Sequence, residues 1–373
     1  MRGGTRRVAA ATLVALLACS AAACSGGDAG RAGPETGETT SPAGKAPENG
    51  RFRSDGPLGL TRASGSATPY LSGAWLGVKT QEPHWTGFGD WRGVPVDVML
   101  GYSENTTWDS IGHAGNLTLF KSFPGTLVYG LSLLPQERGA TLKEVAEGKR
   151  DEVWRKAGRG LVEQNRKRSV IRIGFEANGT WFPWGASRDK AEDYKAAFRR
   201  VATILRESGA EPIIDFDIGC GVGLTGDPDP QAPLTRLYPG DDVVDVMGCD
   251  IYDSRASGQG NPAAKGTATR GPSLQDTLAF ARAHGKPLVV PEWGLDHTYG
   301  RGDQPDFIRA MYDFFDANAK DIAVEIYFNE GASDIKSALW EPELNPRSAE
   351  EYASIWRGKG KAGQGPTASG ATS

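Results

Sequence analysis

The sequence predicts a single (β/α)8 barrel, a closed ring of eight parallel strands with helices packed outside it. Eight short runs rich in Val, Ile and aromatic residues are bounded by Gly, Pro or Asp, which is typical of strands. Between them lie stretches such as 189–207 and 273–284, whose apolar residues recur at helical spacing. Strands that alternate with helices form parallel βαβ units, and eight is the number of strands in this barrel.

The predicted strands are 74–79, 96–101, 126–132, 170–175, 212–218, 243–249, 288–291 and 324–328. An open, doubly wound sheet is the alternative arrangement of the same elements. Such a sheet usually has a glycine-rich turn after its first strand. The residues at 77–80 are Gly-Val-Lys-Thr, which is not such a turn, so the barrel is preferred.

Residues 1–24 have the pattern of an export signal. Three arginines precede an apolar run over 8–18, which has the length of a signal-peptide core. Small residues and two cysteines, Cys19 and Cys24, follow, and this arrangement resembles a bacterial lipobox in which the cysteine thiol is acylated. We take Cys24 as the lipidated residue, with Cys19 and ordinary secretion as alternatives. Each route places the mature protein outside the cytoplasm, and a lipid anchor would hold it on the outer face of the cell membrane.

The composition divides the rest of the chain into three parts. Between residues 25 and 50 there is no Val, Ile, Leu, Met, Phe, Tyr or Trp, so this stretch cannot bury enough surface to offset its ordering entropy. We therefore predict a disordered tether over 25–66. The barrel is expected over 67–357, and a disordered tail of similar composition to the tether over 358–373.

Charge and metal-ligand patterns exclude several classes of function. The 373 residues carry a net charge of −4. Because there is no basic stripe, a nucleic-acid partner is not expected. The four cysteines form no C-x-x-C pair and the four histidines show no ligand spacing, so we predict no metal and no cofactor. We expect a monomer.

Two glutamates follow buried strands at positions where a barrel of this kind carries its chemistry. Glu176 follows the strand at 170–175, and Glu292 follows the strand at 288–291. They are 116 residues apart, or about three βα units, so both belong on one rim and face each other across the mouth. Two carboxylates beside aromatic residues are what glycosidic bond cleavage requires. The plainer interpretation is that each glutamate pairs with an arginine or caps a helix.

The residues around these glutamates resemble the motifs of glycoside hydrolase family 26. The acid/base motif of that family is Arg-Pro-x-His-Glu-Met-Asn-Gly-x-Trp-x-x-Trp. Six residues match it in register: Arg172, Glu176, Asn178, Gly179, Trp181 and Trp184. The segment 245–253 resembles the Val-Asp-x-x-Gly-x-Asp-x-Tyr run of the family, and the stretch that ends Glu292-Trp293-Gly294 is similar to its nucleophile segment.

The resemblance implies a retaining, β-mannanase-like hydrolase that acts by double displacement. It assigns Glu176 as the acid/base, Glu292 as the nucleophile, and Tyr252 as a hydrogen-bond partner of the nucleophile. A polysaccharide or oligosaccharide is the expected substrate, with β-mannan first and β-1,3-xylan or β-glucan as alternatives. A carbohydrate-binding lipoprotein that has lost catalysis on the same barrel is the alternative function.

Three departures from the family pattern bear on the substrate. Phe175 stands where the family has a histidine, and Ala177 stands where it has a methionine. The strand at 212–218 contains Asp215-Phe216-Asp217, where a tryptophan-containing stretch is expected. The catalytic pair is retained, but the substrate class is left open.

Aromatic residues near strand ends support a sugar site, because flat rings cover the apolar C–H faces of sugars. Packing of the loops is the alternative role. The candidate substrate-binding residues are Tyr252, Trp181, Trp184, Asn178, Trp293, Arg172, Trp85 and Trp108, with Asn105, His113 and Asn329 as weaker ones.

Two cysteines remain in the barrel, Cys220 and Cys249. They lie at the ends of consecutive strands, which are neighbours in this fold, and an extracytoplasmic compartment permits oxidation. A disulfide needs Cα atoms within about 7 Å of each other, so it depends on a favourable register. Two buried free thiols are the alternative.

Overall fold

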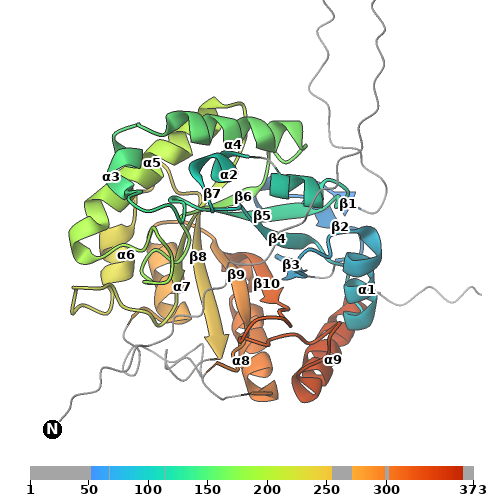
Figure 1. Ribbon diagram of the computed structural model, residues 1–373. Helices are drawn as coiled ribbons and strands as arrows, with labels where there is room; N and C mark the ends of the chain where they lie inside the picture. The colour runs from blue at the N-terminus through green and yellow to red at the C-terminus, as the bar shows by residue number, and fades with distance from the viewer. Residues whose placement is uncertain (1–51, 67, 114, 254–270, 299–301, 364–373) are drawn as a thin grey trace, which may run out of the picture.

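The computed structural model describes residues 52–66, 68–113, 115–253, 271–298 and 302–363. The predicted leader, with Cys19 and Cys24, lies outside the described residues. Eight strands form a closed barrel in the order β10-β3-β4-β5-β6-β7-β8-β9, and every pair of neighbours is parallel. Helices surround the ring of strands (Figure 1). The predicted (β/α)8 barrel is confirmed.

Each predicted strand overlaps one strand of the barrel. The strands are β3 Leu71–Trp75, β4 Val98–Tyr102, β5 Thr126–Leu131, β6 Val170–Ile173, β7 Ile213–Gly219, β8 Val246–Asp253, β9 Leu288–Leu295 and β10 Ile322–Phe328. The largest differences are at β3, which begins three and ends four residues before the predicted strand, and at β8, which begins three and ends four residues after it. Strand β9 continues four residues past its predicted end. In β9, the strand was predicted to end at Pro291. The strand instead continues with register shifts against both neighbours, because proline has no N–H to donate to a strand ladder.

Helices α1 to α8 lie in the connections between strands, and α9 follows the last strand, β10 (Figure 1). They are α1 Glu82–Arg92, α2 Trp108–Gly112, α3 Leu142–Ala146, α4 Asp151–Glu163, α5 Ala191–Glu207, α6 Ala232–Leu237, α7 Leu274–Ala283, α8 Pro305–Ala317 and α9 Pro346–Gly363. Capping boxes at Thr107, Thr141 and Ser273 define the starts of α2, α3 and α7. Among the described residues, no helix is both long and apolar enough to cross a membrane.

Side chains on each strand alternate between the barrel interior and the helical layer. On β7, Ile213 belongs to the apolar cluster inside the barrel, whereas Ile214 and Phe216 belong to the cluster that faces the helices. Asp215 and Asp217 are therefore on the interior face with Ile213. The interior is apolar at its amino-terminal end and becomes acidic toward the carboxyl ends of the strands.

The predicted tether over 25–66 is wrong in its last part, because Leu60 and Ala63 are buried against the barrel. Leu60 is 1% exposed and belongs to the interior apolar cluster. The Asp97 carboxylate accepts hydrogen bonds from the Ala63 N–H at 2.8 Å and the Ser66 hydroxyl at 2.7 Å. The few apolar residues of 52–66 have no helical or strand periodicity, so the sequence pattern did not identify this contact.

The predicted boundary at residue 357 is also wrong. Helix α9 runs from Pro346 to Gly363, into the stretch predicted to be a disordered tail. Glycines have low helix propensity, and their number after residue 357 suggested that the helix had ended.

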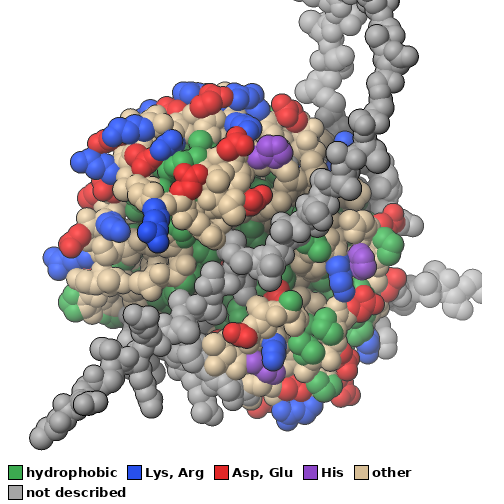
Figure 2. All heavy atoms as spheres, viewed as in Figure 1, with side chains coloured by type: hydrophobic (Ala, Val, Ile, Leu, Met, Phe, Trp, Pro, Cys, Tyr) green, Lys and Arg blue, Asp and Glu red, His purple; other side chains and the backbone are tan. Residues whose placement is uncertain are grey.

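Acidic and basic side chains are interspersed on the face of the molecule shown in Figure 2. Among the described residues, basic and acidic side chains also form ion pairs, such as Arg200 with Asp151 and Arg159 with Glu152, both at 2.6 Å. The visible face therefore has no large patch of one sign.

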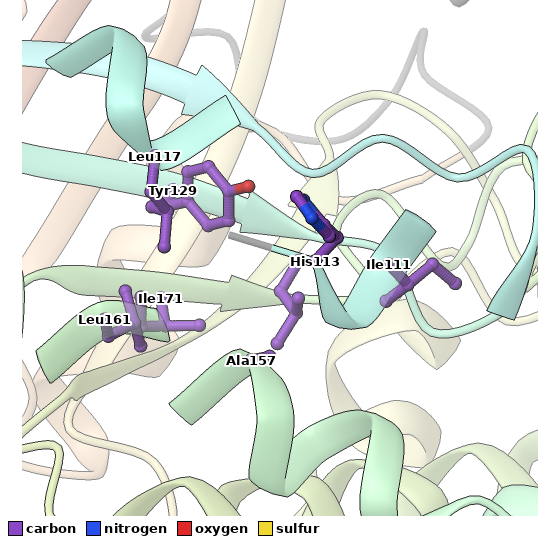
Figure 3. A pocket seen from close by; sticks show the side chains of 8 residues that line it. Ile111, His113, Leu117, Tyr129, Ala157, Leu161 and Ile171 are labelled. Atoms are coloured by element: carbon purple, nitrogen blue, oxygen red, sulfur yellow. The ribbon is translucent and has the colours of Figure 1, made fainter. Parts of the chain in front are cut away.

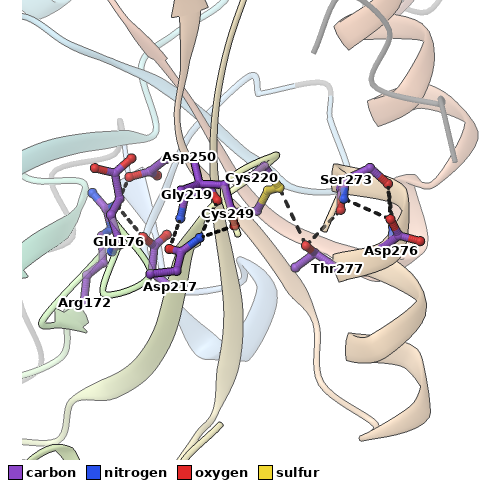
Figure 4. Close-up of a disulfide and its surroundings, with 12 residues drawn as sticks. Arg172, Glu176, Asp217, Gly219, Cys220, Cys249, Asp250, Ser273, Asp276 and Thr277 are labelled. Carbon is purple, nitrogen blue, oxygen red and sulfur yellow. Dashed lines mark hydrogen bonds and ion pairs between the residues drawn. A yellow bond between two sulfur atoms is a disulfide. The ribbon is translucent and has the colours of Figure 1, made fainter. Parts of the chain in front are cut away.

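Cys220 and Cys249 are joined by a disulfide, with Cα atoms 5.6 Å apart. The register places Cys249 opposite Ile218 on β7, and the Cys220 N–H donates to the Asp250 carbonyl at 2.9 Å. The bond therefore ties the end of β7 to β8 beside the interior acidic residues (Figure 4).

We expect no free thiol when the unreduced protein, prepared without residues 1–24, is unfolded and treated with a thiol reagent. Reduction before unfolding should release two thiols per mature domain, and the Cys220→Ser variant should then show one thiol without reduction. Two reactive thiols in the unreduced protein would contradict the bridge.

Candidate active site

The strand-end glutamates belong to one network of buried polar groups at the carboxyl ends of the strands. Glu176 follows β6 in a turn where Gly174 has φ of 55° and Glu176 itself has φ of 49°. A glutamate rarely adopts this left-handed conformation, because its Cβ crowds the following carbonyl. Strained backbone of this kind concentrates at functional sites, where the surrounding structure holds it in place.

Glu292 is held by three hydrogen-bond donors from three other strands. Its Oε1 accepts from the Tyr102 hydroxyl at 2.5 Å and from Arg172 Nη1 at 2.7 Å. Its Oε2 accepts from the Tyr252 hydroxyl at 2.7 Å. The side chain is 6% exposed, so both oxygens are fixed in a nearly buried position.

Arg172 is the cation at the centre of this network. Its guanidinium contacts Asp217 at 3.0 Å, Glu292 at 2.7 Å, and Asp250. Figure 4 shows Arg172, Glu176, Asp217 and Asp250 in one cluster. The arginine is fully buried, so the acidic side chains are arranged around it without intervening solvent.

Glu176 is in an environment that favours its neutral form. Burial raises its pKa to about 8, and the carboxylates of Glu292 and Asp217 contribute to the same shift. The Trp181 indole N–H donates to Glu176 Oε2 at 2.7 Å and opposes the shift. Glu176 is therefore protonated near neutral pH.

Glu292 is in the opposite electrostatic state. Burial alone would raise its pKa, but Arg172 and the hydroxyls of Tyr102 and Tyr252 lower it below its usual range. Hydrogen bonds and a positive charge stabilise the ionised form. The site thus contains one neutral and one ionised carboxyl group, which is the pairing that acid and nucleophile roles need.

Three of the candidate substrate-binding residues lie in this network: Arg172, Tyr252 and Trp181. Trp181 is 36% exposed and contacts Glu176, so it can also meet a ligand. Arg172 is fully buried, so the expectation that it binds substrate is corrected: it contacts the acidic side chains instead.

Two candidate substrate-binding residues, Asn178 and Trp184, instead stabilise the loop after β6 through hydrogen bonds to the backbone. The Asn178 amide donates to the carbonyls of Gly219 and Val222, both at 2.8 Å, and it accepts from the Gly219 N–H. Trp184 is fully buried and donates to the Phe175 carbonyl at 2.8 Å. Their predicted substrate contacts are corrected, because their polar groups are occupied by the backbone.

The other three tryptophan candidates belong to the helical layer. Trp293 donates to Glu325 at 2.6 Å and packs against Phe315 of α8. Trp85, on α1, packs against Phe123 at 5.5 Å between ring centres. Trp108 packs edge-on against Trp154 of α4. All three are nearly buried, so their predicted role in substrate binding is corrected to packing.

The weaker polar candidates are also engaged in local structure. Asn329 holds the loop after β10 through the Trp340 carbonyl at 2.8 Å, and Asn105 accepts from Gln136. His113 is exposed and accepts from the Gly115 N–H. It lines a small apolar cavity between β5, β6 and the helices α2 and α4, which Figure 3 shows.

Sequence reasoning missed three parts of the site. Tyr102 ends β4, and the predicted strand stopped one residue before it. Trp75 and Phe328 end β3 and β10 and stack face to face, with ring centres 4.4 Å apart. Asp217 was noticed only as a departure from a motif. Tyr102 and Phe328 lie at or directly after the ends of the predicted strands 96–101 and 324–328, whereas Trp75 and Asp217 lie inside the predicted strands 74–79 and 212–218, where position alone does not indicate a site.

Among the described residues, no group of three or more His, Cys, Asp or Glu side chains is arranged to hold a metal ion. The guanidinium of Arg172 lies where the acidic side chains of the site converge. The chemistry that this arrangement can perform is proton donation by one carboxyl group and nucleophilic attack by the other.

Comparison with known sequences supports the strand-end motifs. The family model described as glycosyl hydrolase family 26 matches residues 161–285, a stretch that contains Glu176 and ends before Glu292. A mannan endo-1,4-beta-mannosidase of Bifidobacterium adolescentis is 32% identical over 125 residues, which are 34% of this chain and 12% of that protein. Endoglucanase H of Acetivibrio thermocellus is 22% identical over 300 residues, which are 75% of this chain and 29% of that protein. The chain therefore spans less than a third of either curated relative.

Solved structures share the fold at low sequence identity. A mannanase from Bacillus subtilis is 19% identical, with a TM-score of 0.52 over 75% of this chain and 84% of that one. This likeness extends the common barrel beyond the residues that the family model matches. With the strand-end motifs and the match over 161–285, it confirms the resemblance of this chain to glycosyl hydrolase family 26.

Proposed function

We propose that this protein is a retaining glycoside hydrolase that cleaves β-linked polysaccharide, with Glu176 as acid/base and Glu292 as nucleophile. The observation that carries the proposal is the contrast between the two carboxyl groups at the strand ends: Arg172 and two tyrosine hydroxyls donate to Glu292, whereas the Trp181 indole donates to Glu176. Glu176 would protonate the glycosidic oxygen while Glu292 attacks the anomeric carbon. A water molecule, deprotonated by Glu176, would then hydrolyse the glycosyl-enzyme intermediate.

The aromatic residues at the mouth favour a sugar substrate. Trp181 presents a partly exposed ring beside Glu176, and the stacked rings of Trp75 and Phe328 lie at the ends of neighbouring strands. We take β-mannan as the first candidate substrate, because one curated relative is a mannan endo-1,4-beta-mannosidase. The match to an endoglucanase keeps β-glucan as a second candidate, and β-1,3-xylan is the third.

Phe175 bears on this choice. Its ring is buried, lies under Tyr102 and packs edge-on against Phe182 and Trp184. The position where the family has a histidine therefore offers no hydrogen bond to a sugar hydroxyl. Screening the purified protein on mannan, β-1,3-xylan and mixed-linkage glucan, and sizing the products, would identify the substrate class and separate endo from exo cleavage.

The first test of the mechanism is the stereochemistry of the product. NMR of the newly released reducing end should show the anomeric configuration of the substrate before mutarotation, because two displacements restore it. A first-formed product of inverted configuration would overturn double displacement. Absence of hydrolysis with retained binding to a polysaccharide would favour the alternative, a carbohydrate-binding protein on the same barrel.

We further propose that the protein is exported and carries a lipid on Cys24, with Cys19 as the alternative. Both residues lie outside the described part of the chain, so the support comes from the sequence pattern. Metabolic labelling with an alkyne-bearing fatty acid should label the wild-type chain, and Cys24→Ser should abolish the label. Loss of label in Cys19→Ser instead would move the site to Cys19, and an unlabelled wild-type chain would contradict the anchor.

A further inference from the structure

The barrel interior below the two glutamates holds more acidic groups than basic ones. Arg172 is surrounded by Asp215, Asp217, Asp250 and Glu292, at distances up to 4.0 Å. All of these side chains are buried. One arginine cannot balance four buried carboxylates, and an unbalanced charge in such a site is neutralised by binding a proton.

Asp215 has the weakest contact with Arg172 among these four acidic residues. Among the described residues neither of its oxygens has a hydrogen-bond partner, and its ion-pair contact with Arg172 is the longest of the four, at 4.0 Å. Asp217 Oδ2 is also without a hydrogen-bond partner, whereas Asp217 Oδ1 is fully engaged.

Gly248 on β8 makes room for these oxygens. A Cβ at this position would lie 2.7 Å from both Asp215 oxygens and closer still to Asp217 Oδ2. The free oxygens of the two aspartates therefore border one small space beside the glycine. Two carboxyl groups that share such a space cannot both be ionised, and they retain one proton between them.

We propose that Asp215 and Asp217 share one proton, and that this pair positions the acid/base residue and the guanidinium that holds the nucleophile. The proton lies between Asp215 and Asp217 Oδ2, so that Asp217 Oδ1 remains an acceptor. The positioning role rests on the proposed function, whereas the shared proton does not.

The link to the active site is Asp217 Oδ1. It accepts from Arg172 Nη2 at 3.0 Å and from the Glu176 backbone N–H at 3.2 Å. Arg172 in turn donates to Glu292. Asp217 Oδ1 therefore holds the strained backbone of Glu176 and orients the guanidinium that contacts Glu292. Asp217 belongs to β7, the strand whose sequence departs from the family pattern.

The charges that surround Asp215 and Asp217 favour the retention of one proton by the pair. Burial raises the pKa of Asp215, Asp217 adds to the shift, and Arg172 opposes it. Asp217 also faces Glu292, while Asp250 on β8 faces Arg172. From α5, Tyr194 reaches the pair with a hydroxyl that donates to the Gly174 carbonyl and supplies no positive charge.

Infrared spectroscopy tests the shared proton without any substrate. The difference spectrum of wild type minus Asp215→Asn at pH 7 should contain a carboxylic-acid C=O band. Asp242→Asn is the matched control, because Asp242 is an exposed partner of Arg199 and its pKa is lowered; its difference spectrum should contain only carboxylate bands. Carboxylate bands alone in the Asp215→Asn spectrum would overturn the shared proton.

Kinetics tests the positioning role separately. Asp217→Asn keeps an oxygen for the Glu176 N–H but removes the negative charge, so kcat should fall on the order of tenfold or more. The alkaline limb of kcat/KM should also move to lower pH by about one unit, because the charge on Asp217 helps to raise the pKa of Glu176. Asp242→Asn, at the exposed partner of Arg199, is the kinetic control and should stay within about threefold of wild type with an unmoved limb. An unmoved limb in Asp217→Asn would overturn the positioning role, whatever the infrared result.

Discussion

Replacing Glu292 by alanine should reduce kcat by about 10⁴-fold or more, because no other described group can attack the anomeric carbon from its position. The fold should survive the change. Arg172 keeps its contacts with Asp217 and Asp250 after the glutamate is removed. Circular dichroism and the melting temperature should therefore remain close to those of the wild type.

Added azide should restore part of this activity. The cavity left by the Glu292 side chain lies beside Arg172 and the hydroxyls of Tyr102 and Tyr252, which are donors that favour an anion. Azide that attacks from there in one displacement gives a glycosyl azide of inverted configuration. A retained glycosyl azide would show that Glu292 is not the nucleophile.

Glu330 supplies a matched control for this variant. It is a nearly buried glutamate just past the end of β10, and its carboxylate accepts the Ser333 N–H at 3.0 Å. Glu330→Ala removes the same side chain at the end of another strand without touching Arg172. Its activity should stay within about tenfold of wild type, and azide should have no effect. Equal losses in the two variants would indicate a general disturbance of the barrel mouth.

The fold and the two glutamates followed from the sequence because both depend on short-range patterns. Alternating strand and helix signals are local, and parallel strands of a barrel end on one rim, so residues that follow strands meet there. The alternation of side chains along a strand would also have predicted the position of Trp293. It is adjacent to Glu292 in β9, and a strand turns successive side chains to opposite faces. A glutamate inside the barrel therefore requires a tryptophan outside, next to α8.

The parts that the sequence did not reveal depend on partners far along the chain. Asn178 looks like a ligand-binding residue in the motif, but its amide is occupied by the backbone of Gly219 and Val222. Leu60 lies in a polar stretch, but it closes the amino-terminal end of the barrel interior. Each partner is more than 40 residues away or in an irregular loop, where residue spacing carries no information about contact.

The different pKa values of Glu176 and Glu292 also depend on residues that are far apart in the sequence. Glu176 and Glu292 are chemically identical, and the pKa of Glu292 is the lower one because Arg172, Tyr102 and Tyr252 donate hydrogen bonds to it. Arg172 donates to Glu292 across the barrel interior, from a position 120 residues earlier in the sequence. The sequence could suggest the roles only through a family resemblance, whereas the contacts supply the physical reason.

Glu176→Ala should therefore produce a different defect from Glu292→Ala. Natural substrates need a proton on the departing oxygen, so their kcat/KM should fall by about 10²–10⁴-fold, the usual contribution of a general acid. An aryl glycoside with a strongly acidic phenol needs no proton, so its glycosylation step should remain fast. Hydrolysis of the intermediate then lacks its base, and the phenol should appear as a burst followed by slow turnover.

The pH dependence and the effect of azide complete the test of Glu176. In the wild type the alkaline limb of kcat/KM should lie near pH 8, where Glu176 loses its proton. With the aryl glycoside, Glu176→Ala should lack this limb, because no acid remains to titrate. Azide should speed the slow phase and give a product of retained configuration, since it attacks an intermediate already formed on Glu292. An inverted azide product from Glu176→Ala, with a retained one from Glu292→Ala, would mean that the two roles are exchanged.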